Sequence, residues 1–368
     1  MSVSKELVQK VLQNKALTYK SSNAPLSITE QRIDLITDSN DETHIPANSI
    51  LIKVSAVGLN MIDLIFHRLA SPLIFSKKPK TIGIEYSGAI VAIGSGVETD
   101  FKVGDEICGI NMHPFGNGTS SQYILIDSTS KDEMKFCSIP ENLSLREACY
   151  WPVTYSTASE LLESHIKLSK NSRVLIVGGS TMVGRFCIQL LKAIYGVKEI
   201  VAVCSDASSK EVLELGADKT IDYKKYLSIA VPATEAAGPE KFDMVLDCVG
   251  TFDLFSSIDN ILKPKAESSV YVSIAVNIQN RSPFTAFLRN ALGMVYLKIK
   301  DMLNLSTYNY VFQQSSFTKD TLEEGKKLIE SNTFELPPLR FYDWKDYKDA
   351  FKKLEGRSTR GKLILCID

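Results

Sequence analysis

The sequence predicts an α/β protein of two domains, one built on a doubly wound parallel sheet and the other on a β-barrel. Strand and helix patterns alternate from Arg173 onward, as they do in proteins with parallel sheets. Strand patterns separated by glycine turns fill residues 1–150, which is typical of an antiparallel barrel. The length of 368 residues also exceeds what one core usually organises.

The clearest strand–helix–strand unit begins at Arg173. Val174–Val177 is a short β-branched run that fits a strand buried on both faces. After a glycine-rich turn, apolar residues recur at helical spacing over 183–194, and Gly196 is placed to end that helix. A second β-branched run, Ile200–Cys204, completes the unit. Such a unit directs the N–H groups at the start of its helix toward an anion, and dinucleotide pyrophosphates are bound in this way.

The turn departs from the dinucleotide fingerprint G-x-G-x-x-G at one position. It reads Gly179-x-Thr181-x-x-Gly184, so the middle glycine, which lets the backbone approach a pyrophosphate, is missing. The unit is therefore either a dinucleotide site or only a structural element. On the first interpretation we expect the pyrophosphate to contact Gly178, Gly179, Ser180, Thr181, Met182 and Val183.

The composition describes an ordinary globular chain. Its formal net charge is −1, so no global field would recruit nucleic acid or an acidic membrane. Seven cysteines are scattered without a C-x-x-C pair, which is typical of reduced thiols in a cytosolic-type chain. The N-terminus has no apolar run of the signal-peptide kind, and no stretch is long enough to span a bilayer. We expect a cytoplasmic protein.

Residues 1–150 carry strand patterns and little helix. A helix is expected to begin at Ser144, because Glu147 stands three residues later in the capping-box position. Pro152 is expected to interrupt it, and another helix is predicted over 157–168. The expected strands are Ala16–Lys20, Ser49–Val57 and Gly88–Ile93.

Residues 310–368 no longer follow the regular strand–helix alternation of the parallel-sheet domain. We expect this C-terminal part to pack back on the first domain, which makes that domain discontinuous. The predicted boundaries are 1–153 with 310–368 for the barrel domain and 154–309 for the parallel-sheet domain. The elements expected after the first unit are strands over 241–247, 269–274 and 362–367, an extended segment over 337–342, and helices over 252–262, 318–331 and 344–354.

Residues 283–305 form an unusual segment that is apolar around most of a helix. Its cations are Arg289, Lys298 and Lys300. One interpretation is a helix on a lipid or membrane surface, which would place the protein peripherally on a lipid droplet or on the mitochondrial surface. The other, which we favour, is a lid or a subunit-interface helix that covers the edge of the sheet.

A series of short motifs runs through nearly the whole chain. They are Val57-Gly58-Leu59-Asn60-x-x-Asp63, Gly83-x-Glu85-x-x-Gly88, Val103-Gly104-Asp105, Pro152-Val153 with Thr157-Ala158, Leu215-Gly216-Ala217-Asp218 with Ile221-Asp222-Tyr223, Asp247-Cys248-Val249-Gly250 and Arg360-Gly361-Lys362. In this order and spacing they resemble the medium-chain dehydrogenase/reductases, in the zinc-free, quinone-oxidoreductase-like (ζ-crystallin-like) branch and its fungal members. The resemblance implies a GroES-like barrel domain, a Rossmann domain with the coenzyme in the cleft, and commonly a dimer or tetramer.

Zinc divides this family. Zinc-dependent relatives supply an early cysteine and a G-H-E histidine, whereas the corresponding neighbourhoods here hold Asn60–Asp63 and Gly83-Ile84-Glu85. The four-cysteine lobe of the structural zinc is absent as well. Because a catalytic zinc needs three converging Cys, His or acidic ligands, we expect no metal site.

The end of the second strand indicates which nicotinamide coenzyme is used. An acid there would bond the ribose 2′-OH of NAD and repel a 2′-phosphate, but the family's acid position falls on Val203. Ser205 and Lys210 are placed to receive a phosphate, while Asp206 favours NAD if its side chain turns inward. We favour NADP(H).

The resemblance implies hydride transfer to a small-molecule quinone or α,β-unsaturated carbonyl. Without zinc, the developing negative charge needs hydrogen-bond donors, and Asn60, Tyr86 and Thr157 lie on motifs that resemble cleft-lining positions. The tyrosine that similar reductases often carry two residues after Asp63 is Ile65 here, so solvent is the alternative proton source. Further expected coenzyme contacts are Tyr223 beside the adenosine, Val249 and Gly250 near the centre, and Lys362 toward a phosphate.

A second hypothesis is a weakly active or inactive nucleotide-binding or scaffold protein. Thr181 and Met182 beside the missing glycine, and Ile65 in place of a tyrosine, motivate it. Coenzyme binding without turnover would distinguish this protein from an enzyme.

Overall fold

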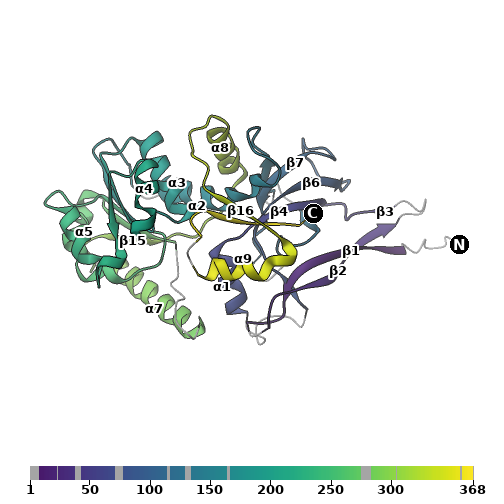
Figure 1. The fold of residues 1–368 in the computed structure, drawn as a ribbon, viewed down its shortest axis with the longest axis horizontal. Helices are drawn as coiled ribbons and strands as arrows, with labels where there is room; N and C mark the ends of the chain where they lie inside the picture. The colour runs from purple at the N-terminus through teal and green to yellow at the C-terminus, as the bar shows by residue number, and fades with distance from the viewer. Residues whose placement is uncertain are drawn as a thin grey trace. The chain divides into compact units, whose positions relative to one another are not determined.

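A computed structural model describes most of the chain and divides it into two compact units (Figure 1). The described residues are 8–22, 24–37, 43–70, 78–113, 117–128, 134–163, 166–274, 283–303, 305–356 and 359–367, without the side chains of 8–10, 37, 43 and 283–290. Unit 1 comprises Met1–Val153, Phe317–Ser331 and Pro338–Asp368, and unit 2 comprises Thr154–Ser316 and Asn332–Pro337. The predicted α/β architecture is confirmed.

Unit 1 is built on two β-sheets. Seven strands form a sheet in the order β16-β17-β4-β6-β7-β9, with β8 paired to β4, and four form a sheet in the order β3-β2-β1-β5. The C-terminal strand β17 pairs antiparallel with β4, which places Ile364 opposite Gly58. The strands are β1 (Val8–Tyr19), β2 (Ser27–Thr37), β3 (Thr43–His44), β4 (Ser49–Gly58), β5 (Lys80–Thr81), β6 (Glu85–Ile93), β7 (Glu106–Ile110), β8 (Tyr123–Asp127), β9 (Phe136–Ser138), β16 (Leu339–Asp343) and β17 (Lys362–Cys366).

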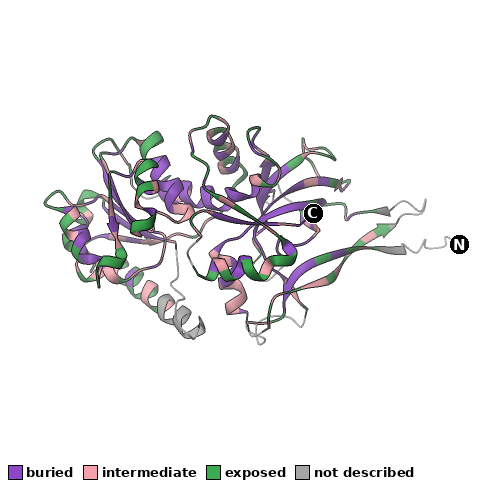
Figure 2. Cartoon of the chain, viewed as in Figure 1, coloured by how far each residue is buried: buried purple, intermediate pink, exposed green. Residues whose placement is uncertain are grey.

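The core of unit 1 joins residues far apart in the sequence. Ile50, Ile52 and Val54 on β4 pack in one cluster with Leu363 and Leu365 on β17, and these strands are buried (Figure 2). The last strand is therefore an integral part of the barrel. The helices of this unit are α1 (Met61–Leu69), α8 (Lys319–Glu330) and α9 (Tyr347–Glu355), with 3₁₀ turns η2 (Glu147–Tyr150) and η7 (Trp344–Asp346).

Unit 2 is built on a six-stranded sheet in the order β12-β11-β10-β13-β14-β15, and every pairing in it is parallel. The strand order reverses between β10 and β13, which defines a doubly wound sheet. Helices α3, α4, α5 and α7 lie around it (Figure 1). The strands are β10 (Arg173–Val177), β11 (Glu199–Cys204), β12 (Lys219–Asp222), β13 (Met244–Asp247), β14 (Val270–Ser273) and β15 (Asn309–Phe312).

The helices of unit 2 follow the predicted alternation. Helix α3 continues as a π-helix, η3, and Gly196 follows it with a φ of +58°, as predicted for the residue that ends it. The elements are α2 (Pro152–Glu163), α3 (Met182–Leu190), η3 (Leu191–Tyr195), α4 (Asp206–Glu214), η4 (Tyr223–Lys225), α5 (Ala230–Ala237), η5 (Asp253–Ser256), α6 (Ile258–Ile261), η6 (Lys265–Glu267) and α7 (Pro283–Met302).

Two predicted helices around residue 150 differ from the structure. The Ser144 N–H does donate to the Glu147 carboxylate, at 2.9 Å, but only the short 3₁₀ turn η2 follows. Pro152 begins α2 instead of interrupting a helix, because the first helical position needs no N–H donor. This helix ends at Glu163, and residues 164–165 of the predicted 157–168 helix lie outside the described residues.

Two further predictions were wrong in extent. The helix expected over 252–262 is divided into η5 and α6. The boundary between the domains was predicted between residues 309 and 310. Strand β15 pairs with β14, so the parallel sheet extends past residue 309, and the chain stays in unit 2 as far as Ser316.

Helix α7 carries a row of exposed apolar side chains. Leu297 is buried, whereas Leu292, Val295, Tyr296 and Ile299 are exposed. No helix among the described residues is long and apolar enough to cross a membrane. The lipid-surface and subunit-interface interpretations of 283–305, together with the cellular location and a homodimer, stay predictions.

Candidate functional site

The turn after β10 is shaped by its glycines. Gly178 has a φ of +88°, a region that favours glycine, and the N–H groups of Gly178 and Gly179 both donate to the Val203 carbonyl at 3.0 Å. A Cβ on Gly184 would lie 2.3 Å from the Gly178 carbonyl oxygen. Helix α3 can therefore pack against the turn only because residue 184 has no side chain.

Thr181, which replaces the middle glycine, is the N-cap of α3. Its hydroxyl donates to the Gly178 carbonyl at 2.8 Å and accepts from the Gly184 N–H at 3.1 Å, so the side chain is held inside the turn. The geometry of a helix start leaves the N–H groups of Met182 and Val183 without an intrahelical partner. The turn thus still offers backbone donors and the positive end of the helix dipole, and it fits a pyrophosphate with one donor fewer.

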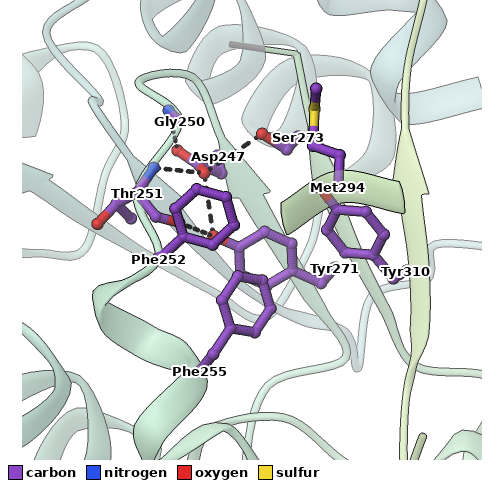
Figure 3. Close-up of a pocket in the computed structure, with 9 residues that line it drawn as sticks. All are labelled: Asp247, Gly250, Thr251, Phe252, Phe255, Tyr271, Ser273, Met294 and Tyr310. Atoms are coloured by element: carbon purple, nitrogen blue, oxygen red, sulfur yellow. Dashed lines mark hydrogen bonds between the residues drawn. The ribbon is translucent and has the colours of Figure 1, made fainter. Parts of the chain in front are cut away.

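Asp247, the last residue of β13, fixes the next loop (Figure 3). Its buried carboxylate accepts the N–H groups of Val249, Gly250 and Thr251 at 3.0, 2.8 and 2.9 Å. The hydroxyl of Tyr271 also donates to it, at 3.0 Å. Burial raises the pKa of Asp247 to about 6, although these donors act to lower it. One acid therefore sets the shape of the loop.

The loops after β10 and β13 touch each other. A Cβ on Gly178 would lie 2.6 Å from Val249 Cγ1 and 3.5 Å from Cys248 Cβ. Because the strand order reverses between β10 and β13, these loops border the crevice in which doubly wound sheets bind ligands. The structure thus brings together the expected pyrophosphate residues and the expected contacts Val249 and Gly250.

A small cavity lies beside Asp247, between the loop and α7 (Figure 3). The rings of Phe255 and Tyr271 are 4.7 Å apart there. The carboxylate is already surrounded by donors, including the Ser273 hydroxyl at 3.3 Å, so we assign the cavity to the support of the loop. Phe252, Met294 and Tyr310 complete its lining.

A larger and more polar pocket lies at the carboxyl ends of β11 and β12. It opens to the solvent, and the space between its lining atoms, open solvent included, is about 480 Å³. Of the expected adenosine-side residues, Ser205 lines it, whereas Lys210 is 91% exposed and pairs with Glu214 at 3.8 Å. Tyr223 is about half-exposed and does not line it. The other lining side chains are Asp206, Ser209, Thr220, Asp222, Lys225 and Tyr226, with the ends of β11 and β12.

Sequence reasoning missed Lys225 and its neighbours. The available signal was the run Ile221-Asp222-Tyr223-Lys224-Lys225 after a predicted strand. Strand β12 pairs with β11 in register, with Asp222 opposite Cys204, and this pairing brings the run to the same edge of the sheet as Ser205. The pairing partner could not be read from the run itself.

In unit 1, three of the motif residues form a buried polar network. The ammonium of Lys362 lies 2.5 Å from the Glu85 carboxylate and donates to the Asn60 side-chain carbonyl at 2.8 Å. The Asn60 amide group donates to Glu85 at 2.9 Å and to the Gly58 carbonyl at 3.1 Å. Lys362 is 2% exposed and Glu85 is fully buried. The ammonium is held inside the barrel, which corrects the expectation that Lys362 reaches a phosphate.

Asp63 extends this network. One of its oxygens accepts the Asn60 backbone N–H at 2.7 Å, and the other has no hydrogen-bond partner among the described residues. Burial raises the pKa of Asp63 to about 7; the Asn60 N–H and Lys362 act to lower it, and Glu85 to raise it. The Val153 N–H donates to the other oxygen of Glu85, at 2.7 Å. These contacts hold both acids in structural positions.

The three expected catalytic residues, Asn60, Tyr86 and Thr157, differ in whether their side chains have a polar group available to a substrate. All polar atoms of the Asn60 side chain are used within the network described above. Tyr86 is fully buried, its hydroxyl has no partner among the described residues, and burial raises its pKa well above the ordinary value. Such a hydroxyl is part of the barrel core rather than a donor to substrate. Thr157 belongs to unit 2, where its hydroxyl accepts from Ser315 at 3.3 Å.

No group of three or more His, Cys, Asp and Glu side chains that could hold a metal ion is found within the described part of the chain. The absence of a metal from the working protein stays a prediction.

Comparisons with known proteins agree with this architecture. Residues 46–137 match the family model described as an alcohol dehydrogenase GroES-like domain, and residues 215–365 match the one described as a zinc-binding dehydrogenase. Protein YIM1 of Saccharomyces cerevisiae is 30% identical over 366 residues, which cover 96% of this chain and 98% of that protein. The chain belongs to the medium-chain dehydrogenase/reductase superfamily.

Solved structures of this superfamily share the fold. The quinone oxidoreductase from Coxiella burnetii is similar with a TM-score of 0.74 and 21% identity, covering 97% of this chain and all of that one. A putative NADPH:quinone reductase from Bacillus thuringiensis is similar with a TM-score of 0.73 and 16% identity over the same shares. The predicted GroES-like domain and Rossmann-type sheet are thereby confirmed.

Proposed function

We propose that this protein is an NADPH-dependent oxidoreductase that reduces quinones or α,β-unsaturated carbonyls without zinc. The observation that carries the proposal is the turn Gly178–Gly184, where the N–H groups at the start of α3, which have no intrahelical partner, meet a loop fixed by Asp247 at the reversal of strand order. The structurally similar proteins from Coxiella and Bacillus are described as a quinone oxidoreductase and a putative NADPH:quinone reductase, which supports the quinone part of this proposal.

Different residues of unit 2 would bind different parts of the coenzyme. The N–H groups of Met182 and Val183 would hold the pyrophosphate, and the loop at Val249 and Gly250 would border its central part. The pocket that Ser205 lines would receive the adenosine side. When bound, the nicotinamide supplies the hydride, and the protein contributes orientation and the exclusion of water.

Zinc independence is supported by what lies at the positions where zinc-dependent relatives carry ligands. There Asn60 and Glu85 are bridged by the buried ammonium of Lys362. A fixed positive charge between two oxygen groups repels a divalent cation. The Lys362 ammonium thus occupies the space beside Asn60 and Glu85 in which a zinc ion would need to bind.

Protonation of the reduced substrate is assigned to water. Asn60 has no free donor and the Tyr86 hydroxyl is enclosed in the core. Position 65 is isoleucine rather than tyrosine. An enolate or hydroquinone anion released toward solvent needs no side-chain acid for its protonation.

The test is binding followed by turnover. Protein treated with EDTA is titrated with NADPH by calorimetry, and NADPH oxidation is then followed at 340 nm with 1,4-benzoquinone and a panel of enones. We expect micromolar binding and turnover that survives chelation. Absence of binding at millimolar NADPH contradicts the proposal.

The second candidate function is a coenzyme-binding scaffold with little turnover. It is favoured by the Thr181 cap, which uses the Gly184 N–H and removes one donor from the coenzyme. In the same assays, NADPH binding without oxidation across the whole substrate panel would support the scaffold, and sustained turnover would reject it.

A further inference from the structure

Among the described residues that line the pocket at the ends of β11 and β12, one carries an ammonium group. Lys225 lies in η4, directly after β12. Its Nζ is 3.5 Å from an oxygen of Asp206 and 3.9 Å from an oxygen of Asp222. Both separations exceed the 2.7–2.9 Å of a tight charge-assisted hydrogen bond. The ammonium therefore stands between two acids and is bound tightly to neither.

The other lysines near this pocket have different surroundings. Lys210 extends from α4 with 91% exposure and pairs with Glu214. The Lys224 Nζ lies 5.9 Å from the centre of the Tyr223 ring. Neither lysine lines the pocket. Lys225 is thus the ammonium placed to meet a ligand there.

The pocket also offers hydroxyl groups. The hydroxyls of Ser205 and Ser208 are 3.2 Å apart, and those of Ser209 and Thr220 are 2.6 Å apart. Three of these residues, Ser205, Ser209 and Thr220, line the pocket. Hydroxyls serve equally as donors to a phosphate or as partners of a ribose, so they support binding but do not by themselves select the coenzyme.

The charged residues Lys225 and Asp206 are the ones that can distinguish NADPH from NADH. The Lys225 side chain is 64% exposed and that of Asp206 is 77% exposed. An ion pair this exposed is screened by solvent and contributes little to stability, so an incoming phosphate dianion can replace it at little cost. Asp222 is only 12% exposed and accepts the Lys224 N–H at 3.1 Å, so it stays in place as a structural group.

We infer that Lys225 selects the coenzyme with a 2′-phosphate by exchanging its ion pair with Asp206 for the phosphate, an inference that rests on the proposed function. The Asp206 carboxylate, released from the pair, then repels the phosphate and limits the preference. The two side chains act in opposite directions, Lys225 toward NADPH and Asp206 toward NADH.

The test compares binding of NADPH, NADH and adenosine 2′,5′-bisphosphate by calorimetry. Lys225→Gln should weaken NADPH and the bisphosphate by about tenfold to a hundredfold, the loss of one charge-assisted contact, and should change NADH by less than about threefold. Asp206→Asn should strengthen NADPH binding relative to NADH. Lys224→Gln, a neighbour with the same charge change, is the matched control and should leave the ratio unchanged.

Circular dichroism and thermal unfolding establish that each variant is folded. If the natural protein binds neither coenzyme, the proposed function fails, and this inference fails with it. If the natural protein binds NADPH but Lys225→Gln keeps the same NADPH-to-NADH ratio, only the inference is overturned. It is also overturned if Lys224→Gln changes the ratio as much as Lys225→Gln does, because general surface charge would then explain the effect.

Discussion

At the scale of the residue, Thr181 decides how the glycine turn meets a phosphate. A threonine in place of glycine could fill the hollow of the turn. Instead its hydroxyl bonds Gly178 and Gly184, and the side chain caps the helix. The substitution therefore costs the coenzyme one N–H donor and leaves the turn in its usual form.

Replacing Thr181 should show how much coenzyme affinity is lost through the missing N–H donor. In Thr181→Gly the Gly184 N–H becomes free, so we expect NADPH to bind about threefold to tenfold more tightly, with a stability loss of only a few tenths of a kcal/mol. Calorimetry and thermal unfolding measure both quantities. Thr181→Ser keeps the cap and should bind like the natural protein; weaker binding by Thr181→Gly contradicts this view of the turn.

At the scale of the element, the buried pair of Lys362 and Glu85 joins the C-terminal strand β17 to β6. Lys362 begins β17 and Glu85 begins β6, and their side chains are 1% and 0% exposed. A buried charge without its partner is strongly unfavourable. The terminal strand is thus fixed in the barrel by charge as well as by its backbone pairing with β4.

Lys362→Met should lower the free energy of unfolding by about 3–5 kcal/mol, because the Glu85 carboxylate is left buried and unpaired. Urea denaturation measures this change. The double variant Lys362→Met/Glu85→Gln removes both charges and should recover much of the loss. A single variant as stable as the natural protein would show that the pair is not buried in solution.

The packing of α3 against its turn gives a second prediction at this scale. Alanine in a helix is ordinarily about 1 kcal/mol more favourable than glycine, but a Cβ at residue 184 would lie 2.3 Å from the Gly178 carbonyl oxygen. Gly184→Ala should therefore destabilise the protein and weaken NADPH binding. A stabilising effect with unchanged affinity would contradict the close approach.

At the scale of the whole molecule, the part of each unit that the structure describes contains one buried acid with a raised pKa. These are Asp63, with a pKa of about 7, and Asp247, with a pKa of about 6. The folded state holds their protons more tightly than the unfolded state, so their contribution to stability is present below about pH 4 and is lost as the pH rises through 6 and 7. Both acids oppose stability at neutral pH.

Asp63→Asn tests whether ionisation of Asp63 lowers the stability of the protein as the pH rises. The asparagine keeps an acceptor for the Asn60 N–H and does not ionise, so its stability relative to the natural protein should rise between pH 5 and 8. Urea denaturation across this range measures the difference. A constant difference would mean that Asp63 does not titrate in this window.

The sequence predicted the features that depend on local pattern, namely the first strand–helix–strand unit, the Gly196 helix end and the class of both sheets. Features that depend on distant partners were missed. Lys225 lines a pocket because β12 pairs with β11, and Lys362 is buried because Glu85, 277 positions away, accepts its hydrogen bond. Nothing near either lysine in the sequence distinguishes it from an exposed one.

The coenzyme is proposed to lie on the N–H groups at the start of α3, and the other proposed coenzyme contacts depend on this placement. Thr181-Met182 is the only Thr-Met pair in the sequence, so labelling with carbonyl-¹³C threonine and ¹⁵N methionine isolates the amide signal of Met182. We predict that NADPH shifts this signal strongly and to saturation. Binding of NADPH that leaves the Met182 amide signal unmoved would contradict the account.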